Sequence, residues 1–142
     1  NPNNPNEIKT QINKKTKMIY TETIGNPSLD VSDLELLSEI AKEYNIPFVV
    51  DSTFTTPYLI RPIEYGANIV VHSLTKWLGG HGTAIGGIVI DAGNFNWQDS
   101  KFRLYTEPDE SYHGIRFAYD LGENNDIAFI MRMRLVPLRN LG

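Results

Sequence analysis

Apolar positions along the chain follow two alternating patterns, one typical of helices and one typical of strands. In residues 31–44 they recur at the spacing of a single helix face. These positions are Leu34, Leu37, Ile40, Ala41 and Tyr44. Short β-prone or continuously apolar runs, typical of strands, occupy residues 18–22, 48–50, 69–71 and 85–90. This alternation predicts an α/β fold with a mainly parallel sheet flanked by helices.

Capping residues predict where the first two helices begin. Asn4 has the character of an N-cap, followed by Pro5 at the first helical position and by Glu7. Ser32 and Glu35 have the spacing of a capping box, so Ser32 is the predicted N-cap of the second helix.

The last third of the chain has a different pattern. Residues 92–122 are rich in polar and aromatic residues with little periodicity, which predicts a long loop or insertion. From Asn124 onward, apolar residues recur at helical spacing and predict an amphipathic helix that contains Pro137. We expect its apolar face to need a partner. Because the chain also opens on Asn1 and not on Met, we expect it to be part of a longer protein.

Composition narrows the class of protein. The 142 residues are 41% hydrophobic and include no cysteine, which excludes a fully disordered chain and a disulfide-stapled miniprotein. Thirteen Lys and Arg against 17 Asp and Glu give a net charge of −4, which argues against a nucleic-acid or anionic-membrane partner. The apolar runs are short for a membrane span, and the lack of cysteine is compatible with the cytoplasm.

Polar residues follow three of the predicted strands, at 22–26, 51–53 and 72–76. The carboxyl ends of parallel strands meet at the same edge of a sheet, where ligands of open α/β sheets bind. We therefore expect these three segments to contribute to one site.

Two residues of these segments carry distinctive chemistry. Lys76 follows an apolar strand and is flanked by Ser73 and Thr75, so a desolvated amine there is suited to a Schiff base, with the hydroxyls donating to phosphate. Asp51 ends the run 48–50 and favours a cationic partner, such as a protonated ring nitrogen. The alternatives are a surface lysine and a solvated or helix-capping aspartate, which are the commoner roles.

Other chemistries lack their motifs. The sequence contains no G-x-G-x-x-G dinucleotide fingerprint, no P-loop and no G-x-S-x-G elbow. His72, His81 and His113 match no zinc-ligand spacing, so we expect no metal site. Phe54, Tyr58 and Trp77 are interpreted as packing groups and not as a stacking platform.

Three blocks, at residues 22–27, 49–54 and 72–82, resemble the Cys/Met-metabolism family of pyridoxal-phosphate enzymes in order and spacing. The resemblance covers residues 4–142. It implies the aspartate aminotransferase-like fold type I. Residues 1–142 would then be the central part of the large cofactor-binding domain, with an N-terminal segment and a C-terminal domain outside them, in a protein about three times as long.

The resemblance also implies a role for each candidate residue, with pyridoxal 5′-phosphate as the cofactor. Lys76 corresponds to the lysine that forms the Schiff base and then carries protons. Asp51 corresponds to the partner of the pyridinium nitrogen, and Asn26 to the residue that contacts the ring hydroxyl. Ser73 and Thr75 correspond to hydroxyls that bind the phosphate.

Within the family, residues 82–87 and the segment 106–114 resemble the sulfhydrylase branch. That resemblance implies γ-replacement on O-acetyl-L-homoserine by sulfide or methanethiol, which gives homocysteine or methionine plus acetate. The alternatives are a cystathionine γ-synthase, a methionine γ-lyase and a catalytically inert fragment.

The resemblance implies further groups outside residues 1–142. They are a Tyr and an Arg of a neighbouring subunit at the phosphate, an upstream aromatic that stacks on the ring, and a carboxylate-binding Arg. It also implies a cytoplasmic homotetramer built as a dimer of dimers. We therefore expect the 142 residues alone to be inactive.

Overall fold

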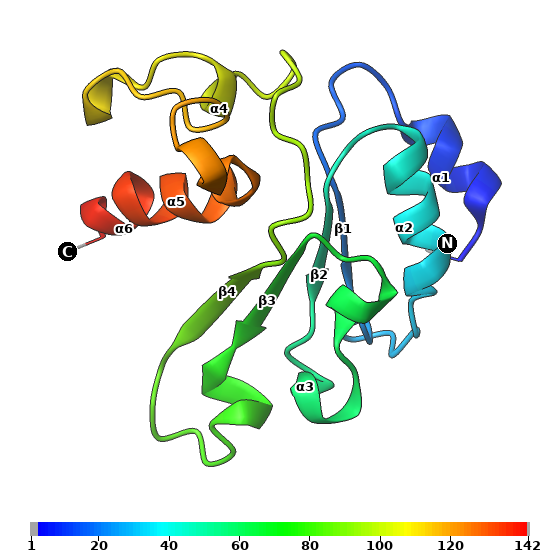
Figure 1. Ribbon diagram of the computed structural model, residues 1–142. Helices are drawn as coiled ribbons and strands as arrows, with labels where there is room; N and C mark the ends of the chain where they lie inside the picture. The colour runs from blue at the N-terminus through cyan, green and yellow to red at the C-terminus, as the bar shows by residue number, and fades with distance from the viewer. Residues whose placement is uncertain (1–2, 142) are drawn as a thin grey trace. The chain divides into compact units, whose positions relative to one another are not determined.

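The computed structural model describes residues 3–141 and divides into two compact units, Asn1–Ile90 and Asp91–Gly142 (Figure 1). No helix within the described residues has the length and apolar character of a membrane span. The strands are β1 (Ile19–Glu22), β2 (Phe48–Asp51), β3 (Ile69–Ser73) and β4 (Gly87–Asp91). The α-helices are α1 (Pro5–Gln11), α2 (Leu34–Glu43), α3 (Thr56–Leu59), α4 (Arg103–Thr106), α5 (Ala128–Leu135) and α6 (Pro137–Asn140). The 3₁₀-helical turns are η1 (Pro62–Tyr65), η3 (Glu110–Tyr112) and η4 (Gly122–Ile127), and η2 (Leu74–Leu78) is a π-helical turn.

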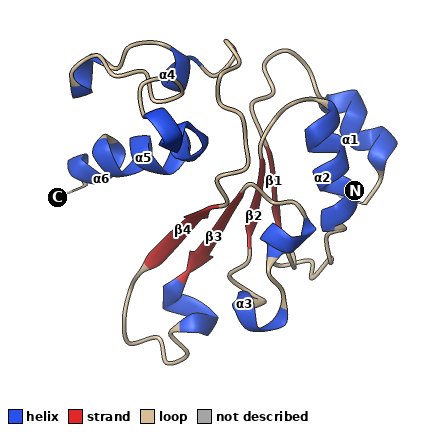
Figure 2. Cartoon of the chain, in the orientation of Figure 1, coloured by secondary structure: helices blue, strands red, loops and turns tan. Residues whose placement is uncertain are grey.

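The four strands form one sheet in the order β1-β2-β3-β4. β1 pairs with β2 and β2 with β3, both in parallel. β4 lies beside β3 and runs in the opposite direction (Figure 2). The predicted α/β fold with a mainly parallel sheet is therefore confirmed, with an antiparallel strand at one edge.

The first helix begins as predicted and the second does not. The side chain of Asn4 caps α1. The N-cap of α2 is Asp33, whose carboxylate accepts a hydrogen bond from the Leu36 amide at 3.0 Å. The predicted cap, Ser32, instead donates its hydroxyl to the carbonyl of Glu22 at 2.8 Å. That bond to β1 takes the serine away from the helix end, so the capping-box prediction is wrong by one residue.

The core of the first unit lies between α2 and the sheet. Alternate residues of each strand point to opposite faces, and the α2 side of the sheet is the more deeply buried. The residues of this cluster are Leu34, Leu37, Ala41, Ile46, Phe48, Val50, Ala67 and Val70. The predicted helix and strand runs supply six of these eight residues, and the connections supply Ile46 and Ala67.

Phe48→Ala is expected to lower the free energy of unfolding by about 3–5 kcal/mol, because Phe48 has no exposed surface and its loss leaves a cavity. Chemical denaturation followed by circular dichroism measures the change. Leu59→Ala is the control, since Leu59 is 71% exposed and such a change is expected to stay within about 0.5 kcal/mol. Equal losses in the two variants would contradict this account of the core.

An aromatic cluster organises the second unit, in part of the segment expected to be a loop. Trp97 contacts the rings of Phe95, Phe102, Tyr105 and Phe129 at centroid distances of 4.6–5.7 Å. The segment therefore has few regular elements but a packed interior of its own. Its lack of periodicity reflects the short elements that carry these rings, such as α4.

The predicted C-terminal helix is interrupted at Pro137. α5 ends at Leu135, Val136 has φ −113° and ψ −72°, and Pro137 begins the short α6. Proline lacks the amide hydrogen that a continuous helix requires, and its ring clashes with the preceding turn. The single helix predicted from residue 124 onward is thus three successive elements, η4, α5 and α6.

Asp109 is expected to make the stability of the second unit depend on pH in the acid range. Hydrogen bonding by the Ser111 hydroxyl and the charge of Arg132, 3.0 Å away, lower the pKa of its carboxyl group. A lowered pKa stabilises the fold above the ordinary aspartate pKa, and this contribution is lost as the pH falls through the lowered value. Asp109→Asn is expected to cost about 1–3 kcal/mol at neutral pH and less below pH 3, measured by denaturation at each pH. Burial raises the pKa of Asp91, so the contribution of Asp91 to stability changes with pH in the opposite direction. The Asp109→Asn variant is therefore compared with the parent at each pH, because both proteins contain Asp91. A pH-independent difference would exclude this role.

Candidate functional site

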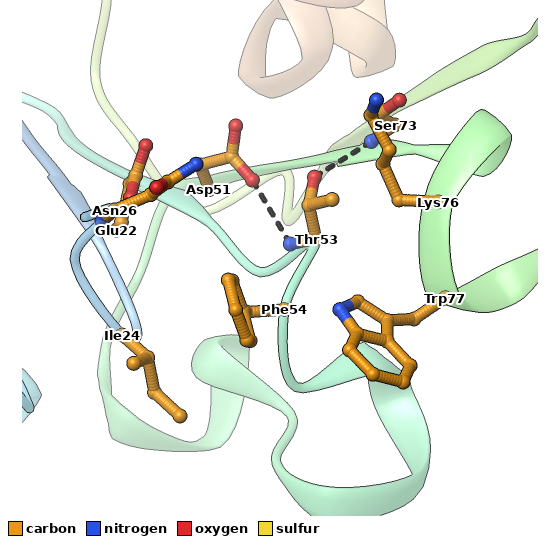
Figure 3. Close-up of a pocket in the computed structure, with 9 residues that line it drawn as sticks. All are labelled: Glu22, Ile24, Asn26, Asp51, Thr53, Phe54, Ser73, Lys76 and Trp77. Carbon is orange, nitrogen blue, oxygen red and sulfur yellow. Dashed lines mark hydrogen bonds between the residues drawn. The ribbon is translucent and has the colours of Figure 1, made fainter. Parts of the chain in front are cut away.

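The carboxyl ends of the three parallel strands surround a pocket of about 330 Å³ (Figure 3). It lies within the first unit and has a size typical of small-molecule sites. Its walls combine charged, hydroxyl and aromatic side chains. The lining residues are Glu22, Ile24, Asn26, Asp51, Thr53, Phe54, Ser73, Lys76 and Trp77. Four of the predicted site residues, all except Thr75, therefore share one pocket.

Asp51 forms the carboxylate side of the pocket and is in register with Glu22 on β1. Its Oδ1 accepts a hydrogen bond from the Thr53 amide at 2.9 Å, and its Oδ2 accepts one from the Tyr20 hydroxyl at 3.2 Å. Within residues 3–141 no basic side chain pairs with Asp51. A carboxylate at the end of an apolar strand favours a cation, so this wall favours a ligand with a positively charged nitrogen.

Thr53 connects the carboxylate to the next strand. Its amide donates to Asp51, and its Oγ1 accepts a hydrogen bond from the amide of Ser73 at 2.7 Å. Figure 3 shows both bonds. The ends of β2 and β3 are thereby held in a fixed relation, which places Asp51 and Ser73 on the same pocket.

Lys76 follows β3 on the π-helical turn η2, where its own φ of −94° and ψ of −122° depart from helical values. The residue lines the pocket and is exposed. The sequence predicts a desolvated amine, but the part of the chain that the structure describes leaves Lys76 open to solvent. The position of Lys76 at the pocket agrees with the prediction, whereas the predicted burial of its amine is not observed.

Asn26 lines the pocket, whereas Thr75 does not. The backbone amide of Asn26 donates to Glu22 Oε2 at 2.7 Å, which holds the turn after β1 at the pocket. Thr75 does not line the pocket, because its Oγ1 accepts from the Gly86 amide at 3.0 Å and donates to the Gly86 carbonyl at 3.3 Å. Ser73 is therefore the predicted phosphate-binding hydroxyl that the pocket contains.

Two aromatic side chains form another wall. The rings of Phe54 and Trp77 lie with centroids 5.9 Å apart and planes inclined at 44°. They pack on each other, as expected, and they also line the pocket (Figure 3). This second role was not predicted from the sequence. It could have been inferred from position, because each residue directly follows one of the polar segments at a strand end. The packing role predicted for Tyr58 is wrong, because Tyr58 is 93% exposed.

His72 is a structural residue and not a ligand. It is 4% exposed, and its Nδ1–H donates to the carbonyl of Ser52 at 3.0 Å. The hydroxyl of Ser52 in turn lies 2.8 Å from that of Thr55, in a buried polar cluster. In residues 3–141, no group of three His, Asp or Glu side chains is arranged to hold a metal ion.

Comparison with known proteins identifies similar chains. A family model described as "Cys/Met metabolism PLP-dependent enzyme" matches residues 1–122. The O-acetyl-L-homoserine sulfhydrylase of Leptospira meyeri is 50% identical over 97% of this chain and 32% of its own length. The homocysteine synthase of Schizosaccharomyces pombe is 43% identical over 100% of this chain and 33% of its own length. The chain thus spans about a third of the length of these curated relatives.

Solved structures that superpose on this chain carry related names. A Campylobacter jejuni structure assigned as an O-acetylhomoserine (thiol)-lyase superposes with a TM-score of 0.85 and 31% identity. The match covers 98% of this chain and 34% of that one, which carries a pyridoxyl-lysine monophosphate. A cystathionine γ-lyase from Lactobacillus plantarum superposes with a TM-score of 0.62 and 34% identity, over 64% of this chain and 24% of its own.

Proposed function

Because this chain belongs to the Cys/Met metabolism family of pyridoxal-phosphate-dependent enzymes, we propose that its pocket binds pyridoxal phosphate for an amino-acid γ-replacement. The observation that carries the proposal is the pairing of functional groups in one pocket. An amine, Lys76, and a carboxylate without a basic partner among the described residues, Asp51, line the same cavity.

The donor set of the pocket fits this cofactor. Asp51 offers a carboxylate to the ring nitrogen, and Lys76 offers a primary amine to the aldehyde. Ser73 would offer a hydroxyl to the phosphate, and Asn26 would offer its side-chain amide to the ring, since both residues line the pocket. When bound, pyridoxal phosphate withdraws electrons from the carbons of an amino-acid substrate.

The chain's own residues then hold the cofactor and move protons. Asp51 keeps the ring nitrogen charged, because a carboxylate close to it favours the protonated form. Lys76 would accept and return protons at Nζ during the reaction. The long side chain of Lys76 and its position on the η2 turn suit a group that alternates between two bonding states.

For the reaction, we propose the replacement of the acetate group of O-acetyl-L-homoserine by sulfide or methanethiol. The bond from the γ-carbon to oxygen breaks and a carbon–sulfur bond forms, while the sulfur's proton leaves with acetate. Homocysteine or methionine results without a change of oxidation state. The names of the relatives that match nearly the whole chain support this substrate. The cystathionine γ-lyase match covers only 64% of the chain and supports the alternatives less.

The test uses the full-length protein that contains this chain, loaded with pyridoxal phosphate. O-acetylhomoserine is supplied with sulfide, with methanethiol, with cysteine or with no thiol. Homocysteine formed with sulfide, or methionine formed with methanethiol, supports the proposal when no amino-acid product forms without a thiol. An α-keto acid released without a thiol would identify a γ-lyase, and cystathionine formed with cysteine would identify a cystathionine synthase.

We also propose that residues 1–142 are the central part of the cofactor-binding domain, that the protein is a cytoplasmic homotetramer assembled from dimers, and that the 142 residues alone are inactive. The relatives' length, about three times that of the chain, supports the first point. Light scattering of the full-length protein measures the subunit number, and activity assays on the isolated chain test its inactivity.

A further inference from the structure

Tyr20 stands beside the site without belonging to its predicted residues. It is opposite Val49 in the β1–β2 register, so Asp51, two residues farther along β2, projects from the same face of the sheet. Side chains at such diagonal positions are within reach when one is aromatic. The Tyr20 hydroxyl accordingly donates to Asp51 Oδ2 at 3.2 Å.

The bond from Tyr20 completes the support of the carboxylate. The Thr53 amide holds Oδ1, and the Tyr20 hydroxyl holds Oδ2. Each oxygen keeps a further lone pair for a ligand, whereas rotation of the carboxylate would break one of the two bonds. With Thr53 alone, the plane of the Asp51 carboxylate would be far less restricted.

We infer that Tyr20 is a positioning residue, which orients the Asp51 carboxylate toward the ring nitrogen of the cofactor. The inference rests on the proposed function only in taking that nitrogen as the partner of Asp51. A hydroxyl suits this role because it fixes the carboxylate and leaves its negative charge in place. A basic side chain would neutralise that charge.

The surroundings keep Tyr20 a donor. Tyr20 is 54% exposed. Its partial burial, followed by the charge of Asp51, raises the pKa of its hydroxyl to about 12, and the hydroxyl is protonated at neutral pH. The charged groups around the same pocket are Glu22 on β1 and Lys76 on η2. Glu22 accepts a hydrogen bond from the Asn26 amide. Within residues 3–141, the donors to the Asp51 carboxylate are the Tyr20 hydroxyl and the Thr53 amide.

The test compares Tyr20→Phe with the parent in the full-length protein. The apoprotein is titrated with pyridoxal phosphate, and the absorption spectrum of the lysine-bound cofactor is recorded. Loss of one hydrogen bond to a charged group is expected to raise the dissociation constant of the cofactor about 3- to 10-fold. The same loss is expected to change the long-wavelength band, since the charge near the ring nitrogen is displaced.

Tyr65→Phe is the matched control, because Tyr65 lies in the same unit on η1 and does not line the pocket. A double-mutant cycle with Asp51→Asn then separates positioning from a general structural effect. The effect of Tyr20→Phe is expected to shrink to less than about twofold on the Asp51→Asn background, since the coupling passes through the carboxylate.

The possible outcomes distinguish failure of the Tyr20 role from failure of the proposed cofactor site. Equal effects of Tyr20→Phe on both backgrounds, or an unchanged affinity and spectrum with native Asp51, would overturn the role of Tyr20 and leave the proposed function intact. An Asp51→Asn variant with the parent's cofactor affinity and spectrum would instead refute the proposed site, and the role of Tyr20 with it.

Discussion

Lys76→Ala is expected to lower kcat/KM by at least about 1,000-fold in the full-length protein, because the variant loses both the amine that binds the cofactor and the group that moves protons. Absorption of the lysine-bound cofactor is expected to vanish. Borohydride reduction followed by peptide mapping gives the direct measurement. In the parent, the label is expected on the peptide that contains Lys76.

Two further variants make this result specific. Lys76→Arg keeps the positive charge but offers no amine for a Schiff base, so it is expected to be as inactive as Lys76→Ala. Lys14→Ala removes an exposed lysine of the α1–β1 connection and is expected to retain parent activity. Labelling of a different lysine, or an active Lys76→Ala enzyme, would remove the assignment.

Asp51→Asn is expected to lower kcat/KM by about 100-fold or more, a loss typical of removing one electrostatic stabiliser from an active site. The amide has the shape of the carboxylate but no charge, so it does not favour a protonated ring nitrogen. Because the Thr53 amide can still donate to the one side-chain oxygen that asparagine keeps, the fold is expected to tolerate the change.

The measurement is a pair of assays, steady-state kinetics and a thermal melt. Asp30→Asn is the control, because Asp30 is an exposed residue of the turn after β1 and its side chain is not among those that line the pocket. If Asp51→Asn melted far below the parent, loss of structure would account for the inactivity. Parent-like kinetics in this variant would instead exclude a role for the charge.

The strands were predictable from the local pattern of apolar residues. The convergence of their ends was predictable because parallel strands end at the same edge of a sheet. The run 48–50 is apolar throughout, which fits a strand covered on both faces, and parallel strands end at one edge. These two facts suffice to bring Asn26, Asp51, Ser73 and Lys76 to one pocket.

The features that were missed depend on contacts between distant residues. Ser32 and Asp33 are both good N-caps, and the bond from Ser32 to β1 decides between them. Thr75 is withdrawn from the pocket by Gly86, eleven residues away on the connection to β4. Tyr20 meets Asp51 only because β1 pairs with β2 in one particular register, and local periodicity does not specify a register.

β1 combines an edge position in the described sheet with the residue that we propose orients Asp51. β1 is an edge strand of the described sheet, and an open edge is a template for pairing with other chains. The same four residues carry Tyr20, the donor to Asp51. A segment that pairs with β1 would therefore act twice: it would block edge-to-edge aggregation, and it would restrict the strand that aligns the carboxylate. Loss of edge protection and loss of cofactor affinity are then two results of a single disturbance.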